Sequence, residues 1–185
     1  MTDLVAVAKQ LQDFCEAKKW SFCIIGGLAL QMWGENRVTM DVNVTLLTGF
    51  GEEEKYVDSL LEKFPSRITG AKEFALLRRV LLLESSNGIG IDISLGAFDF
   101  EASMVARATY QYYLPHLSLK ICTAEDLIVT KSFADRPKDW FDIESILIRQ
   151  PDLDWEYIFE QLTPIVELKE APEILIRLGK LKSQS

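Results

Sequence analysis

One stretch of the sequence constrains the fold more than any other, because a buried strand, a glycine turn, a helix and an alternating strand follow one another in it. The apolar run SFCII ends at Gly26 and Gly27, and LALQMWG then indicates a helix that stops at Gly34. Residues 38–47 alternate apolar and polar side chains, as a half-buried strand does. A glycine pair at the mouth of a helix lets a phosphate approach backbone N–H groups, although a plain tight turn is the simpler interpretation.

The alternation separates two faces of this strand. It places Met40, Val42 and Val44 on one face, and Asp41, Asn43 and Thr45 on the other. A later alternating run, IGIDISL, carries Asp92 on its polar face. Oxygen ligands on adjacent strands beside a phosphate suit Mg²⁺ or Mn²⁺, and two such ions can stabilise both oxygens of a phosphoryl displacement. The sequence predicts a metal site at Asp41, Asn43 and Asp92, while each acid taken alone is as well explained as a solvated residue.

The remaining patterns predict helices around this small sheet. Amphipathic spacing indicates a helix in LVAVAKQLQDFCEAKKW and another at about 52–63, and FEASMVARA is a further helical candidate. The runs LLRRVLLLES and IGIDISL flank SNG, which predicts a β-hairpin, and LSLKI is another short strand. From Thr123 onward we expect only helices, one capped by TAED, one beginning near Pro137, and two at about 154–168 and 171–182. The predicted fold class is α+β, with a small mixed β-sheet core at 1–122 and a C-terminal helical bundle at 123–185.

Composition limits the functions open to the chain. Its 185 residues suffice for a real core, and a formal charge of −8 argues against a surface that coats duplex nucleic acid, but not against a locally held nucleotide or RNA end. Cys15, Cys23 and Cys122 form no metal-ligand spacing with the lone His116, so they are expected to be buried small hydrophobes rather than zinc ligands. Without a signal-peptide pattern or a membrane-spanning run, we expect a cytoplasmic protein.

The order of these motifs resembles the nucleotidyltransferase superfamily, whose pattern is a Gly-Gly or Gly-Ser turn, an Asp-x-Asp strand and a third Asp on a later strand. Within it, the chain is most similar to the AbiEii-like branch, which includes toxins of type IV toxin–antitoxin systems. IIGGLALQMWGENRVTMDVNV carries the first part, and TAEDLIVTKSFADRPKDWFDIESIL resembles the branch's later segment. The matching positions are Arg37, Thr39, Asp41 and Asp92, followed by Lys131, Arg136, Asp139 and Asp142. The resemblance covers about residues 20–148.

The resemblance implies a polymerase-β-like core and a Mg²⁺- or Mn²⁺-dependent transfer of a nucleoside monophosphate from an NTP to an acceptor. That acceptor would be RNA such as a tRNA end, a protein hydroxyl, or a small molecule such as an aminoglycoside or lincosamide. A tRNA or an antitoxin protein would be the macromolecular partner. The implied nucleotide-binding residues are Gly26, Gly27, Arg37 and Thr39, the metal ligands are Asp41, Asn43 and Asp92, and the catalytic residues are Asp41, Asp92, Lys131 and Asp142.

Helical spacing gives the later positions independent support. Lys131 shares a stripe with Leu127 and Ala134, so its ammonium group is expected to point inward rather than to extend into solvent as a surface lysine. Asp139 and Asp142 lie on the packing stripe of their helix. Asp139 is also explained by the helix dipole in a first turn, whereas Asp142 is expected to pair with Lys131 or Arg136.

Asn43 departs from the superfamily pattern, because an amide stands where a second carboxylate is expected. Three explanations of Asn43 are open: a weakened or one-metal enzyme, a degenerate member that binds nucleotide without turnover, and an engineered inactivation of a toxic protein. The alternative function is therefore a catalytically silent nucleotide-binding or protein-interaction module of the same fold. A purely structural protein has no motif in its favour.

Overall fold

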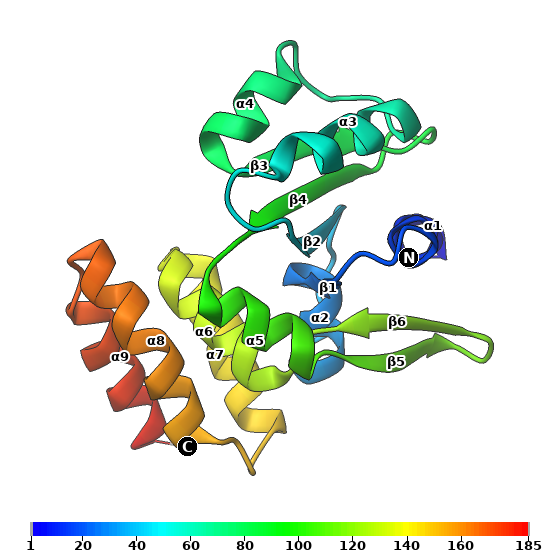
Figure 1. Ribbon diagram of the computed structural model, residues 1–185. Coiled ribbons are helices and arrows are strands. Elements are labelled where there is room, and N and C mark those ends of the chain that lie inside the picture. The colour runs from blue at the N-terminus through cyan, green and yellow to red at the C-terminus, as the bar shows by residue number, and fades with distance from the viewer. Residues whose placement is uncertain (1, 185) are drawn as a thin grey trace. The chain divides into compact units, whose positions relative to one another are not determined.

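The structure, a computed structural model, describes residues 2–184 and has an α+β fold built on a mixed six-stranded sheet of order β3-β4-β2-β1-β6-β5 (Figure 1). The strands are β1 (Phe22–Ile25), β2 (Asp41–Leu47), β3 (Val80–Glu84), β4 (Gly90–Gly96), β5 (Thr109–Leu114) and β6 (Leu117–Ile121). The helices are α1 (Thr2–Ala17), α2 (Gly26–Trp33), α3 (Glu53–Lys63), α4 (Ala71–Arg78), α5 (Asp99–Arg107), α6 (Ala124–Ala134), α7 (Pro137–Arg149), α8 (Trp155–Lys169) and α9 (Glu173–Lys182). The predicted fold class is confirmed.

Pairing in the sheet is mixed, as predicted. Strand β2 lies between β1, which is antiparallel to it, and β4, which is parallel to it. Strands β3 and β4 form the antiparallel hairpin expected from SNG, closed by a bond from the Ser85 N–H to the Ile89 carbonyl oxygen of 2.9 Å. The two strands that carry Asp41 and Asp92 are therefore direct neighbours.

One face of the sheet forms the core of this part of the chain. The alternate residues Val42, Val44 and Leu46 of β2 are at most 1% exposed, and their counterparts on β4 are equally buried. Phe14 of α1 makes an edge-to-face contact with Phe64, the residue after α3, with ring centroids 5.9 Å apart. Burying one such aliphatic side chain contributes about 1.5–3 kcal/mol, so the period-2 pattern fixes which face of β2 and β4 is left for polar residues.

Helix α5 covers only one end of the opposite face. Thr45 on that face is 2% exposed, and a Cβ on Gly96 would lie 3.1 Å from the Thr45 side chain and 3.3 Å from Glu101 of α5. The other end of the face, at Asp41, Asn43 and Asp92, is only half-buried. The polar residues there are consequently accessible to a ligand.

Three sequence predictions are wrong in detail. Strand β2 begins at Asp41, so residues 38–40 lie outside it, and Val38 and Met40 are 84% and 82% exposed. The run LLRRVLLLES is divided between α4 and β3 by Arg79, whose φ of 56° cannot continue either element. Strand β5 was not predicted; one of its faces is exposed, and on the other only Gln111 and Tyr113 are half-buried, so no buried apolar face marks it in the sequence.

Contacts within the chain group its described residues into two units. The first contains residues 2–28 and Val38–Cys122, and the second contains Ala29–Arg37 and residues 123–184. Cys15, Cys23 and Cys122 are buried in the first unit, as expected of small hydrophobic residues. No helix within residues 2–184 is long and apolar enough to cross a membrane.

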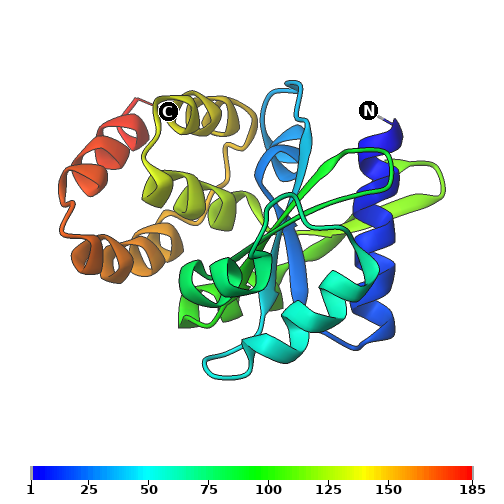
Figure 2. The same cartoon turned by 90° about the horizontal axis from the view of Figure 1, so that it is seen from above.

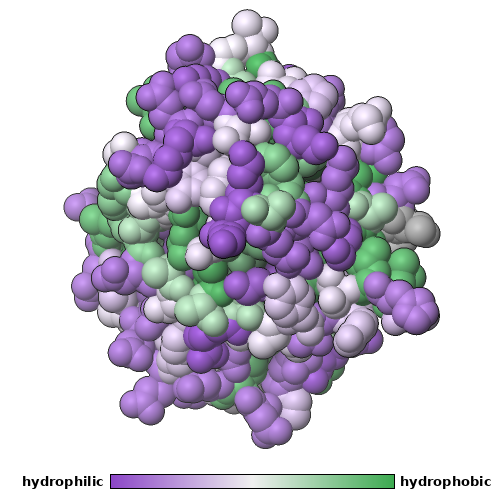
Figure 3. Space-filling model, turned by 45° about the vertical axis from the view of Figure 1, so that its right-hand side comes forward, coloured by the Kyte–Doolittle hydropathy of each residue, from purple (hydrophilic) through white to green (hydrophobic). Residues whose placement is uncertain are grey.

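The second unit holds the predicted C-terminal helices α6 to α9, drawn from yellow-green to red in Figure 2. Helix α6 begins at Thr123, whose hydroxyl accepts the Asp126 N–H, and α7 begins at Pro137. The end of α2 packs on α7, because a Cβ on Gly34 would lie 2.5 Å from the Ser145 Oγ and the Arg149 Nη1 donates to the Gly34 carbonyl oxygen at 2.9 Å. On the face of the molecule in Figure 3, hydrophilic residues predominate and apolar residues form small separate areas.

Candidate active site on strands β2 and β4

The glycine turn between β1 and α2 is packed directly against polar residues of the following strand. Gly26 has a φ of 67°, a left-handed conformation that favours glycine, and a Cβ there would lie 3.0 Å from the Asn43 Cβ. A Cβ on Gly27 would lie 2.5 Å from the Thr39 Cβ, closer than two carbon atoms can approach without a shift. Both glycines are therefore required for the backbone of the turn to approach Thr39 and Asn43.

Strand register places the predicted metal ligands on one face. Asn43 is paired with Asp92 across β2 and β4, and Asp41 is paired with Gly90. Since paired residues of adjacent strands point to the same side, Asp41, Asn43 and Asp92 share the half-buried face described above. The Thr39 hydroxyl donates to the Asp41 Oδ1 at 3.1 Å, which orients that carboxylate.

An arginine that the sequence analysis missed completes this group. The Arg67 guanidinium forms an ion pair with the Asp92 carboxylate. Its Nη1 lies 2.8 Å from the position that a Cβ on Gly90 would occupy, so the missing side chain of Gly90 makes room for it. A glycine at the first position of β4 was the one available signal that another group approaches the strand there. We refer to Asp41, Asn43, Arg67 and Asp92 as the sheet cluster.

The electrostatic environment of Asp92 is mixed. Burial raises the pKa of its carboxyl group above the ordinary value of 3.8; the Arg67 charge opposes the rise and the negative charge of Asp41 adds to it. The rise in pKa outweighs the effect of the arginine, so Asp92 holds its proton more tightly than a solvated aspartate. A carboxylate with a raised pKa is better suited to accept a proton near neutral pH.

The donor set of the sheet cluster fits a hard divalent cation. It offers two carboxylates and one amide from neighbouring strands, and oxygen atoms are the ligands that Mg²⁺ prefers. Within residues 2–184, no three His, Cys, Asp or Glu side chains form a metal-binding group. The roles of Asp41, Asn43 and Asp92 as metal ligands stay predictions.

The later predicted residues form a separate group in the second unit, which we call the helical cluster: Arg37, Lys131, Arg136, Asp139 and Asp142. Lys131 is 6% exposed, and its Nζ donates to the Asp142 Oδ2 at 2.6 Å and to the Asp139 Oδ1 at 3.4 Å. Arg136 binds Asp139 through two nitrogens at 2.6 and 3.2 Å. The inward direction expected for Lys131 and its pairing with Asp142 are thus present.

Asp142 is the centre of this cluster. Besides Lys131, it accepts two hydrogen bonds of 2.9 Å from the Arg37 Nε and Nη2, a bidentate pair. Burial would raise the pKa of the Asp142 carboxyl group, but the hydrogen bonds from Arg37 and Lys131 outweigh it, and the pKa lies below 3.8. The nucleotide-binding role of Arg37 and the catalytic roles of Lys131 and Asp142 stay predictions, and the observed contacts make Asp142 a positioning residue for two cations.

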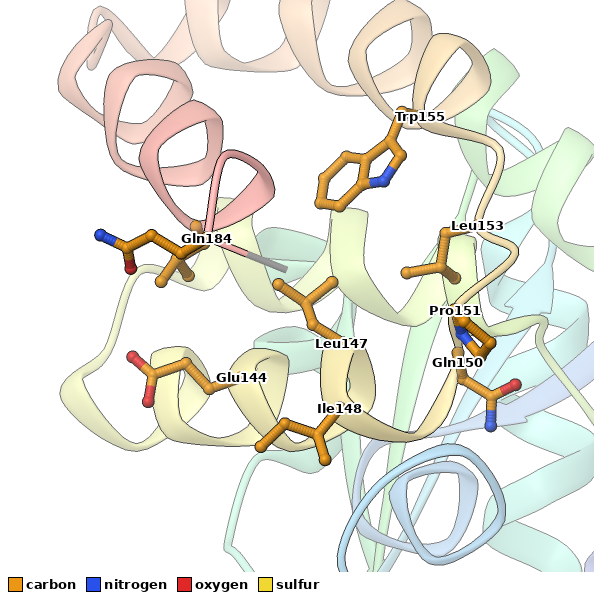
Figure 4. A pocket seen from close by; sticks show the side chains of 9 residues that line it. Glu144, Leu147, Ile148, Gln150, Pro151, Leu153, Trp155 and Gln184 are labelled. Atoms are coloured by element: carbon orange, nitrogen blue, oxygen red, sulfur yellow. The ribbon is translucent and has the colours of Figure 1, made fainter.

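A cavity of about 630 Å³ also lies in the second unit (Figure 4). It is lined mainly by apolar side chains and amides, namely Leu147, Ile148, Gln150, Pro151, Leu153, Trp155, Leu181 and Gln184, with Glu144 as its charged residue. None of the predicted site residues lines it. With one acid and no basic side chain in its wall, the cavity does not have the composition of a phosphate site.

Comparison with known proteins places the fold. No protein-family model matches the chain, and no curated protein matches it. It is similar to the solution structure of the antibiotic-resistance factor ANT(2'')-Ia, with 17% identity, 93% of this chain and 96% of that chain covered, and a TM-score of 0.54. It is also similar to the crystal structure of ANT(2'')-Ia in complex with adenylyl-2''-tobramycin, with 15% identity and a TM-score of 0.51; the match covers 100% of this chain and 99% of that chain. At these identities the likeness shows that this chain shares the fold of ANT(2'')-Ia.

Proposed function

We propose that this protein is a Mg²⁺-dependent nucleotidyltransferase that moves a nucleoside monophosphate from an NTP to an acceptor and releases pyrophosphate. One observation carries the proposal: the close-packed Gly26-Gly27 turn lies directly against a strand whose carboxylate shares a half-buried face with a second carboxylate on the next strand. A phosphate cradle beside oxygen ligands for a divalent ion is the arrangement that phosphoryl transfer requires. The shared fold supports the same conclusion.

Each residue of the sheet has a proposed role. Backbone N–H groups at Gly26 and Gly27 bind phosphate oxygens, and Thr39 holds Asp41 in orientation. Asp41, Asn43 and Asp92 hold the ion, which supplies positive charge to the phosphate oxygens when it is bound. Asp92, with its raised pKa, lies nearest the attacking hydroxyl and accepts its proton.

The helical cluster has a second proposed role. Lys131 neutralises phosphate charge, as the resemblance to the AbiEii-like branch implies, and Arg37 assists it. Asp142 holds both cations through the contacts described above. The resemblance to the AbiEii-like branch implies an RNA or protein acceptor, the target of a cytoplasmic toxin. The adenylylated tobramycin bound to ANT(2'')-Ia suggests a small-molecule acceptor instead.

A screen for label transfer tests the proposal. The protein is incubated with each of the four α-³²P-NTPs and Mg²⁺ or Mn²⁺, and with total RNA, lysate protein, or a mixture of aminoglycosides and lincosamides. We expect label to pass from one NTP to one acceptor class and to be lost in the Asp41→Asn variant. Nucleotide binding without transfer to any acceptor would contradict the proposal and support the silent binding module, which Asn43 favours.

A further inference from the structure

Arg67 is held in place by the backbone of its own segment. The Arg67 N–H donates to the Leu82 carbonyl oxygen at 3.1 Å, the Glu84 N–H donates to the Pro65 carbonyl oxygen at 2.9 Å, and Ser66 forms a bridge with Leu83. The segment 65–67 is therefore fixed along the outer edge of β3. From there the side chain crosses to β4, the next strand, and reaches the face that carries the sheet cluster.

The guanidinium lies against the Asp92 carboxylate and close to Asp41. It pairs with Asp92, and it contacts the position of a Gly90 Cβ, which is itself 3.7 Å from the Asp41 Cβ. Asp92 responds electrostatically to both Arg67 and Asp41, so all three charges are close together. About a third of each paired side chain, 32% for Arg67 and 31% for Asp92, is exposed, which leaves the guanidinium accessible to a phosphate.

The charges of the site explain why this arginine accompanies Asn43. Three carboxylates with two divalent ions leave one net positive charge to face a triphosphate. Two carboxylates with one guanidinium and one divalent ion leave the same net charge. Arginine binds phosphate oxygens through a fixed, permanently charged fork, so it can supply the charge that a second ion would bring.

We propose that this site takes a single divalent ion and that Arg67 is a resident cation in the place of a second ion, binding the triphosphate of the nucleotide. The inference rests on the proposed function and names a nucleotide-binding residue of that same site. Asn43 is then a matched partner of Arg67, because the loss of one carboxylate and the presence of one guanidinium compensate for the missing ion.

The test counts the Mn²⁺ ions bound per chain, from the electron paramagnetic resonance signal of the Mn²⁺ that stays free. It is done at saturating α,β-methylene-ATP and repeated with the α,β-methylene analogues of GTP, CTP and UTP. We expect one ion per chain in the native protein and two in Asn43→Asp/Arg67→Ala, which has three carboxylates and no resident cation. Arg67→Ala alone should keep one ion and bind the analogue about tenfold more weakly, as expected for loss of a charge-assisted hydrogen bond.

Two further variants separate position from charge. Gly90→Ala keeps every charge but puts a Cβ 2.8 Å from the Arg67 Nη1, so it should displace the guanidinium and weaken analogue binding about threefold. Arg78→Ala removes an exposed arginine at the end of α4 and should change neither ion number nor affinity.

The outcomes separate this inference from the proposed function. Two ions in the native protein, one ion in the double variant, or unchanged analogue affinity in Arg67→Ala would overturn the role of Arg67, while measured label transfer would leave the proposed function intact. Failure of every variant to bind Mn²⁺ and analogue would overturn both.

Discussion

The sheet cluster and the helical cluster both combine aspartates with basic side chains, yet they differ in burial and in charge balance. In the helical cluster, Asp139 and Asp142 are 1% and 5% exposed, and each accepts hydrogen bonds from two cations. In the sheet cluster, two half-buried carboxylates accompany one guanidinium. Each carboxylate of the helical cluster thus has two cationic partners, whereas the two carboxylates of the sheet cluster share one guanidinium, a deficit of positive charge that a ligand can fill.

The two clusters also shift the pKa values of their carboxyl groups in opposite directions. In both, burial raises the pKa, but the hydrogen bonds of two cations reverse the effect at Asp142, while one arginine beside a second acid does not reverse it at Asp92. Cations in the helical cluster therefore stabilise the folded chain, and the sheet cluster stores unfavourable charge that favours cation binding. Four changes would break or sharpen this comparison.

Removal of the central acid of the helical cluster should have the largest effect. Asp142→Ala leaves Lys131 and Arg37 without this partner, and loss of one member of a buried ion pair typically lowers the free energy of unfolding by about 3–5 kcal/mol. Urea unfolding followed by tryptophan fluorescence measures the change. Glu144→Ala, an exposed acid on the same helix, should shift stability by less than about 0.5 kcal/mol. Equal effects of the two variants would mean that the network contributes no stability.

Neutralising Asp41 should weaken the metal site most. Asp41→Asn removes one of the two carboxylate charges, and we expect Mn²⁺ affinity in the presence of α,β-methylene-ATP to fall about 100-fold. The free energy of unfolding should stay the same or rise slightly, because repulsion between Asp41 and Asp92 disappears. Calorimetry and urea unfolding measure the two quantities. A large loss of stability with unchanged Mn²⁺ affinity would make the sheet cluster structural and reverse the comparison.

Restoring the missing acid should have a smaller, opposite effect. Asn43→Asp is nearly isosteric and should raise Mn²⁺ affinity about tenfold and increase label transfer. If Asn43 inactivates a toxic enzyme, cells that express this variant should also grow more slowly. Calorimetry, label incorporation and growth curves test the three outcomes. Unchanged affinity together with absence of transfer would support the silent binding module.

The smallest expected effect is a difference between the pKa values of Asp92 and Asp142, which an acid titration can measure. Carboxyl ¹³C NMR should show Asp92 titrating above 3.8 and Asp142 below it. Asp142 therefore stabilises the fold above its unfolded pKa, and that contribution is lost as the pH falls through its folded pKa. The contribution of Asp92 to stability has the opposite sign. Its ionised form destabilises the fold, and protonation as the pH falls through its raised folded pKa removes that destabilisation. In Arg67→Ala, the pKa of Asp92 should rise further; an unchanged value would show that Arg67 does not contact it in solution.

The sequence predicted the parts of the molecule that depend on local order. Alternation on β2 and β4 determines the shared face of Asp41, Asn43 and Asp92, because side-chain direction in a strand follows from residue parity. The stripe on α6 likewise gave the inward direction of Lys131. The limits of β2 were not predictable from alternation alone, since a strand begins where a partner strand begins.

Arg67 was not predictable by such arguments. Its contact joins residues 25 positions apart and depends on where the segment 65–67 meets the edge of β3. The pairing of Arg37 with Asp142 spans 105 positions, so the resemblance identified Arg37 as a conspicuous residue without indicating its contact. Long-range ion pairs are products of tertiary packing, and no local period in the sequence encodes them.

The buried cysteines allow local opening of the structure to be measured chemically. All three lie in the unit that contains the sheet, at most 1% exposed, and the second unit has none. Burial, with a smaller effect of Glu16, raises the pKa of the Cys15 thiol to about 12, so little of the reactive thiolate form exists while α1 stays packed. A thiol reagent can therefore modify these residues only when the structure around them opens. The rate of modification therefore measures how often the first unit opens locally, and no cysteine has to be introduced to measure it.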